Sequence, residues 1–249
     1  MIASLAPTAL FAPAQPGRTA NQRSDLGTTA ARAFRWSIED RTPLTRLFSD
    51  ASVVKRFLNE IVGKGPAPEY GNYIDHVKEY RLIDLRGDGW LELVALIDTS
   101  GREFCNAVTI ISLLQNGALR AYDEFDGFGM QTVGGDQIPG LDFALRDIDK
   151  DGVYEIIVPL VLRESAITAE PNADIESVFA WDGYQYQKAD VRFGDYFKSF
   201  VLPRLERERK ALEAIDESRL GPYERRIHRL YLENAAIAIA EARKRASPQ

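Results

Sequence analysis

Residues 147–158 read DIDKDGVYEIIV, an acidic loop that runs directly into an apolar segment. A poorer copy, DLRGDGWLELVAL, spans residues 84–96. The first aspartates of the two copies lie 63 residues apart, a spacing typical of a repeated supersecondary unit. The repeat therefore predicts two copies of one β-structure, each with an acidic turn between its first two strands.

The side chains of the second copy are those that calcium prefers. Ca²⁺ takes about six to eight oxygen ligands in a flexible geometry. Alternate side chains of a tight turn converge on one point, and Gly152 permits the positive φ with which the chain folds back. We therefore predict a calcium site, the main one, whose ligands are Asp147, Asp149, Asp151, the backbone carbonyl of Val153, and Glu155. The carboxylates of an empty loop repel one another, so we expect the loop to need a cation to be well ordered.

The first copy predicts a weaker or vestigial site. Its candidate ligands are Asp84, Asp88, the backbone of Trp90, and Glu92, but Arg86 stands at the third position, where an oxygen is needed. The guanidinium can take the cation position itself by bonding Asp84 and Asp88. A polar turn whose aspartates and glycines serve only the backbone is the alternative for this copy.

The segment 147–156 resembles the calcium loop of the FG-GAP or VCBS repeat family, which occurs in integrin-type β-propellers and in many secreted bacterial proteins. The family pattern has three alternating acidic or amide residues, then a glycine, then an acid that leads into an apolar strand. The second copy matches this pattern at all of its ligand positions, and the first copy matches it in part. The resemblance covers about residues 75–190, and it implies four-stranded blades, structural calcium and a binding role. An EF-hand is disfavoured, because its closing Glu lies further along and helices flank its loop.

Two blade-like units are too few to close a propeller, which takes at least about four. Three arrangements remain open. The two sheets pack on each other with helices over their exposed edges, several chains assemble a ring, or the units form an open pair that serves as a docking surface. We favour the first arrangement.

The chain divides into four predicted parts. Residues 1–33 are rich in Ala, Pro, Thr and Gln, and we predict a disordered or signal-like tail. Residues 34–74 form a helical N-terminal segment, whose best helix, residues 50–62, has apolar side chains at helical spacing. Residues 75–190 form the two-repeat β domain. Residues 191–249 form a C-terminal helical hairpin, divided at Gly221-Pro222.

The predicted fold class is therefore α+β. It has two four-stranded antiparallel blade-like β-units with Asp-rich calcium loops, plus an N-terminal helix and a C-terminal α-helical hairpin. Residues 141–146 are expected to be a strand that enters the second loop, and the Gly-rich residues 127–140 are expected to connect the two units. Asn116-Gly117 and Asp182-Gly183 are predicted hairpin turns, because these residues tolerate positive φ.

Composition narrows the function classes. The net charge of −6 argues against a nucleic-acid partner, and no stretch reaches the roughly 18 apolar residues of a membrane span. The single cysteine, Cys105, forms no intrachain disulfide, which suits a reducing compartment and equally a secreted protein stabilised by metal. Residues 2–14 resemble a signal peptide that lacks its basic start. We predict a secreted or periplasmic protein, with the cytoplasm left open.

The function predicted from these features is calcium-stabilised binding of a protein or polysaccharide partner, with homo-oligomers possible and no catalytic residue assigned. One rival is a hydrolase with an active site on the blade loops, which predicts a pocket that gathers carboxylates such as Asp126 and Asp136. Another rival is an inhibitor or immunity-type protein that blocks an enzyme. It predicts a protruding loop at residues 163–175.

Overall fold

The computed structural model describes residues 36–62, 77–98, 105–114, 120–121, 130–163 and 171–247. The tail predicted for residues 1–33 and the predicted Asn116-Gly117 turn lie outside these ranges. Among the described residues, none of the helices combines the length and the apolar character needed to cross a bilayer.

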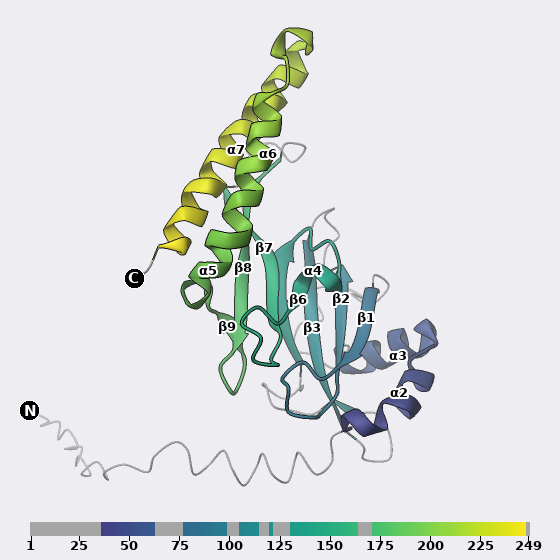
Figure 1. The fold of residues 1–249 in the computed structure, drawn as a ribbon. Coiled ribbons are helices and arrows are strands. Elements are labelled where there is room, and N and C mark those ends of the chain that lie inside the picture. Colours follow the sequence, from purple (N-terminus) through teal and green to yellow (C-terminus); the bar gives the residue numbers. More distant parts are fainter. Residues whose placement is uncertain are drawn as a thin grey trace, which may run out of the picture. The chain divides into compact units, whose positions relative to one another are not determined.

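Two antiparallel sheets form the centre of the fold (Figure 1). The first contains β1 (Val77–Ile83), β2 (Glu92–Asp98), β3 (Cys105–Leu114) and β5 (Met130–Asp136), with the short β4 (Arg120–Ala121) paired to the end of β3. The second runs in the order β6 (Leu145–Arg146), β7 (Glu155–Arg163), β8 (Ala173–Trp181) and β9 (Tyr186–Lys188). We call residues 84–91 loop 1 and residues 147–154 loop 2. Each loop joins the first two strands of its sheet, as the repeat predicts.

The helices precede and follow the sheets. A 3₁₀ turn (Ile38–Asp40) leads into α2 (Arg41–Leu47), which is followed by α3 (Ala51–Val62). Asp50 caps α3, since its Oδ1 accepts a hydrogen bond from Ser52 N at 2.8 Å. The helix predicted for residues 50–62 is therefore confirmed.

The C-terminal hairpin consists of α6 (Leu202–Glu213) and α7 (Pro222–Ala246), with the 3₁₀ turn η6 (Glu217–Arg219) between them. It is entered through η4 (Asp190–Phe193), the short α5 (Gly194–Tyr196) and a π-helical turn (Phe197–Val201). Pro222 is the first residue of α7, where its missing N–H costs nothing, and Pro203 is the second residue of α6, which directly follows the π-helical turn. The prediction of a helical hairpin here agrees with this structure.

The first sheet is buried on both faces, because alternate side chains of a strand point in opposite directions. Leu93, Ala95 and Ile97 of β2 pack in one core with α2 and α3. Val94 and Leu96 pack in a second core, against the other sheet.

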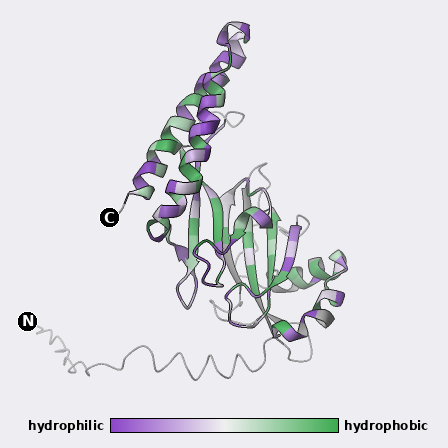
Figure 2. Cartoon of the chain, in the orientation of Figure 1, coloured by the Kyte–Doolittle hydropathy of each residue, from purple (hydrophilic) through white to green (hydrophobic). Residues whose placement is uncertain are grey.

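The second sheet is also covered on both faces. Ile156 and Val158 of β7 lie in the core between the sheets, and Ile157 lies in a third core with Phe197 and Ala238 of the helical region. Figure 2 shows the resulting concentration of hydrophobic residues on the central strands. The layers therefore follow the order helices, first sheet, second sheet, helical hairpin.

The predicted α+β class, with two antiparallel sheets and flanking helices, is confirmed at this level. The favoured arrangement, in which the sheets pack on each other, is also confirmed. One detail was wrong, because the helices cover the outer faces of the sheets and not their edges. The apolar runs of β2 and β7 explain this, since a strand that is apolar on both faces has to be buried on both.

Residues 141–146 were wrongly predicted as one strand. Leu141–Ala144 form the short helix α4, and only Leu145–Arg146 are β6. The helix start is fixed from outside the segment, because Leu141 N donates to Glu79 Oε2 of β1 at 2.8 Å. No local pattern in the sequence signals a partner so distant along the chain.

The Gly-rich connection was also partly wrong, because it contains strand β5 along the edge of β3. Gly135 is part of this strand and does not form a turn. A Cβ at Gly135 would lie 2.7 Å from Val158 Cβ on the facing sheet. The glycine thus allows a close approach between the sheets. In the sequence alone, such a glycine looks like part of a loop.

Candidate metal centre

The two loops share two positions of positive φ. Gly87 and Lys150 occupy equivalent positions with φ of 64° and 62°. Gly89 and Gly152 follow with φ of 83° and 87°. Positive φ is unusual for a lysine, so loop 2 holds Lys150 in a conformation that loop 1 gives to a glycine.

The closing glutamate and the first aspartate bind backbone N–H groups in both loops. Leu85 N donates to Glu92 Oε2 at 2.9 Å, and Ile148 N donates to Glu155 Oε2 at 2.8 Å. The first aspartates accept from equivalent glycines, from Gly89 N at 2.9 Å in loop 1 and from Gly152 N at 3.2 Å in loop 2. These carboxylates therefore shape the turn whether or not a cation is bound.

The loops also lie against each other. Tyr154 N of loop 2 donates to Leu85 O of loop 1 at 2.9 Å. A Cβ on Gly87 would lie 2.6 Å from Gly152 O. Leu91 N of loop 1 makes the equivalent bond at 2.7 Å to Trp36 O, so the segment before α2, loop 1 and loop 2 are stacked head to tail.

Three of the predicted ligands of loop 2 come together. One carboxylate oxygen from each of Asp147, Asp149 and Asp151 lies within 4.8 Å of the other two, so this group could hold a metal ion. Asp147 Oδ1 is buried and, within the described part of the chain, receives no hydrogen bond. Glu155 lies outside the group, and the predicted role of the Val153 carbonyl stays a prediction.

Glu155 is a buried carboxyl group close to two other acidic side chains. The residue is only 1% exposed, and burial raises the pKa of its carboxyl to about 7, with a further contribution from the nearby charges of Asp149 and Asp151. Among the described residues, no cationic side chain lies within ion-pair distance of it. Without a bound cation, Glu155 therefore holds its proton more strongly than an exposed glutamate does.

Loop 1 has its own cation. Arg86 forms an ion pair with Glu92 at 3.2 Å, and both side chains are almost fully buried. The guanidinium also lies over the Trp181 ring, 4.6 Å from its centre. The arginine thus lies inside the loop, as the sequence suggested, and its ion-pair partner is Glu92. Asp84 instead accepts hydrogen bonds from backbone N–H groups of the loop. The weaker metal site proposed for loop 1 stays a prediction.

Arg192 is a functional candidate that the sequence analysis missed. It lies on η4, 43 residues along the chain from Asp149. Its Nη2 donates to Asp149 Oδ2 and lies 3.5 Å from Asp151 Oδ2. No local motif marks this residue, because its partner loop is brought to it only by the packing of the second sheet.

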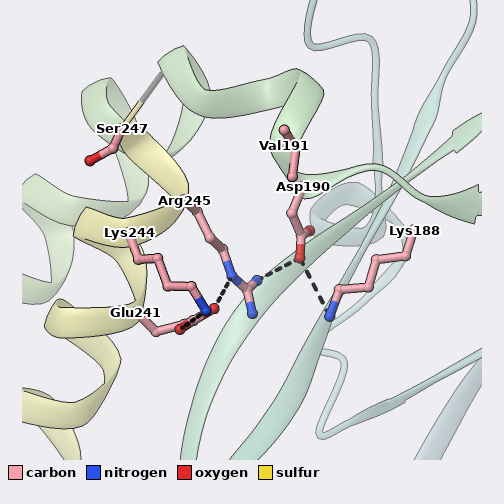
Figure 3. Close-up of a pocket in the computed structure, with 7 residues that line it drawn as sticks. All are labelled: Lys188, Asp190, Val191, Glu241, Lys244, Arg245 and Ser247. Atoms are coloured by element: carbon pink, nitrogen blue, oxygen red, sulfur yellow. Dashed lines mark hydrogen bonds and ion pairs between the residues drawn. The ribbon is translucent and has the colours of Figure 1, made fainter. Parts of the chain in front are cut away.

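A buried ion pair fixes η4 against the hairpin (Figure 3). Arg245 of α7 binds Asp190 at 2.9 Å, with both side chains 8% exposed. Asp190 Oδ1 also accepts from Val178 N at 2.7 Å. These groups border a cavity of about 170 Å³, lined by Lys188, Asp190, Val191, Glu241, Lys244, Arg245 and Ser247. Both of its carboxylates are paired with basic side chains, and the Arg245–Asp190 pair links the hairpin to η4.

The described ranges include few of the residues named for the two rival functions. Asp126 lies outside the described ranges, and so does most of the predicted protruding loop. Residues 173–175 of that loop belong to β8, and Arg163 belongs to β7. The connection between the two strands is therefore shorter than predicted.

No protein-family model matches this chain, and neither a curated protein nor a solved structure is significantly similar to it.

Proposed function

We propose that loop 2 binds Ca²⁺ and that the ion stabilises a binding protein of the FG-GAP or VCBS type. The observation that carries this proposal is the group formed by Asp147, Asp149 and Asp151, with the orphaned Oδ1 of Asp147 inside the loop. A buried polar atom without a partner is costly, and a cation bound there would remove that cost.

The donor set favours a hard cation. All three side chains offer carboxylate oxygens, which suit Ca²⁺ and Mg²⁺ better than softer metals. An irregular loop that mixes side-chain and backbone oxygens suits Ca²⁺, because Mg²⁺ demands a near-ideal octahedron. Asp147, Asp149 and Asp151 would hold the ion, with Glu155 and the Val153 carbonyl as further ligands. The ion supplies positive charge and cross-links the turn.

The biological role proposed with this site is recognition of a protein or a polysaccharide, by a protein that is secreted or periplasmic. The resemblance of residues 147–156 to the calcium loops of FG-GAP and VCBS repeats supports it. The negative net charge of the chain also supports partners other than nucleic acids.

The test is thermal unfolding of the whole protein in EDTA and in calcium. Free calcium at about 100 times its dissociation constant adds about 2.7 kcal/mol to the free energy of unfolding, so the unfolding midpoint should rise. Asp149→Ala should lose this rise, because it removes one of the three gathered carboxylates. Asp195→Ala is the matched control, since Asp195 is exposed and lies outside both loops.

Each variant is compared with itself, with and without calcium, so that a change in its calcium-free stability does not enter the result. A midpoint that is equal in EDTA and in calcium for the unmodified protein would contradict the proposal. An equal rise in Asp149→Ala would place the calcium elsewhere in the chain.

A further inference from the structure

Arg192 binds the same carboxylates that a metal ion in loop 2 would need. Its guanidinium contacts Asp149 and Asp151, two of the three residues whose oxygens are gathered there. An oxygen that faces a guanidinium N–H cannot at the same time face a cation bound at the centre of the group. Arginine and metal ion therefore compete for the oxygens of these two side chains.

Arg192 is anchored through its backbone, and its half-exposed side chain contacts Asp149, Asp151 and the Phe193 ring. Two other residues of η4 are buried, Asp190 in the ion pair with Arg245 and Phe193 in the core beneath the hairpin, whereas Val191 is exposed. The Arg192 side chain itself is half exposed, so its head can turn into solvent without moving the backbone. A half-exposed ion pair of this kind contributes little to stability, so a metal ion can replace it.

We propose that Arg192 is a built-in counter-ion of loop 2, which divalent cations displace and which lowers the affinity of the loop for them. This inference rests on the proposed calcium site. Without metal, the guanidinium neutralises part of the charge of Asp149 and Asp151. With metal, the side chain leaves the loop, and the repulsion between guanidinium and metal ion weakens binding.

Arg192 lies outside loop 2 and regulates it from η4. Because the arginine belongs to η4, anything that holds this segment against the hairpin also holds the competitor close to the site. The affinity of loop 2 for calcium then depends on the packing of the C-terminal region, although that region supplies no ligand.

The experiment is calorimetric titration of calcium into the whole protein, with Arg192→Gln compared with the unmodified chain. The dissociation constant should fall about fivefold to tenfold in Arg192→Gln, as a competing ion pair and a like charge are removed. Arg209→Gln is the matched control. Arg209 is exposed to a similar degree, pairs with Glu213 on α6 and lies outside loop 2, so its substitution should leave the dissociation constant unchanged.

A second readout follows the arginine directly. The Nε–H resonance of Arg192 in a proton–nitrogen correlation spectrum should shift during the calcium titration, and that of Arg209 should not. If Arg192→Gln does not fold, Arg192→Lys keeps the charge without the planar guanidinium fork, and a smaller gain in affinity is expected.

The outcomes separate the two proposals. Calcium binding of equal strength in the unmodified protein and in Arg192→Gln would overturn this inference and leave the calcium site intact. Weaker binding in Arg192→Gln would also overturn it, because the arginine would then support the metal-bound loop. Absence of calcium binding from both proteins would overturn the proposed function and the inference together.

Discussion

Loop 1 and loop 2 are built alike but neutralise their acidic side chains in different ways. Both have the same pair of positive-φ positions and the same closing glutamate. Loop 1 neutralises its glutamate with Arg86, which is part of the loop and is buried with it. Loop 2 has Asp149 in the equivalent place and receives its cation, Arg192, from another element.

Some acidic side chains of the two loops shape the turn, and others are left for a ligand. The closing glutamate and the first aspartate of each loop bind backbone N–H groups, so these acids are explained in loop 1 without metal. Asp149 is different, because its partner among the described residues is a half-exposed arginine. The charge at this position is what makes loop 2 a candidate metal centre and loop 1 a closed ion pair.

The largest expected effect is in loop 1. Arg86→Leu leaves Glu92 buried without its ion-pair partner, and breaking a buried pair in this way costs about 3–5 kcal/mol. The counterpart Arg192→Leu removes a half-exposed pair and should cost less than about 1 kcal/mol. Urea unfolding of both variants measures the difference.

A second variant shows whether the lost charge is the cause. Arg86→Leu combined with Glu92→Gln should recover part of the stability, since Gln still offers an oxygen to Leu85 N but carries no charge. Equal costs for Arg86→Leu and Arg192→Leu would break the contrast between a buried and a replaceable cation.

The next effect is a pH dependence that belongs to loop 2. The pKa of Glu155 in the folded protein is raised from its ordinary value of 4.5 to about 7, mainly by burial. Between these values the folded state binds more protons than the unfolded state, so stability is greatest below the lower value and is lost as the pH rises through the upper one. The loss is on the order of 3 kcal/mol in calcium-free protein.

Denaturant unfolding at a series of pH values across this window measures the slope. Glu155→Gln should flatten it, because the amide does not titrate and still offers an oxygen to Ile148 N. A slope that persists unchanged in Glu155→Gln would show that another group is responsible.

The sequence predicted those parts of the molecule whose signals are local. Both loops could be found, since their acids and glycines stand at fixed offsets, and α3 and the hairpin followed from helical periodicity. Predictions failed where a distant contact decides the outcome. Glu79 accepts a hydrogen bond from the first residue of the helix at 141–144, and Gly135 lets its strand lie close to the facing sheet. Arg192 reaches loop 2 from η4.

A smaller effect concerns the position shared by Gly87 and Lys150. Gly87→Ala should destabilise the protein by about 2 kcal/mol, because alanine is strained at positive φ and its Cβ would lie 2.6 Å from Gly152 O. Thermal or urea unfolding checks this. A change near zero would mean that loop 2 can move away from loop 1 without cost.

The smallest effect, and one of opposite sign, is expected at the equivalent position of loop 2. Lys150→Gly removes the strain of a lysine at a φ of 62°, which is partly offset by the greater freedom of glycine in the unfolded chain. We expect a stabilisation of less than about 1 kcal/mol, measured beside Gly87→Ala by the same unfolding curves. The two signs have one structural cause. Loop 1 needs a glycine because Gly152 O of loop 2 lies against it, whereas the lysine of loop 2 shows that a Cβ fits at the equivalent position there. If Lys150→Gly is destabilising instead, the lysine contributes something beyond its backbone, and its side chain becomes the next group to test.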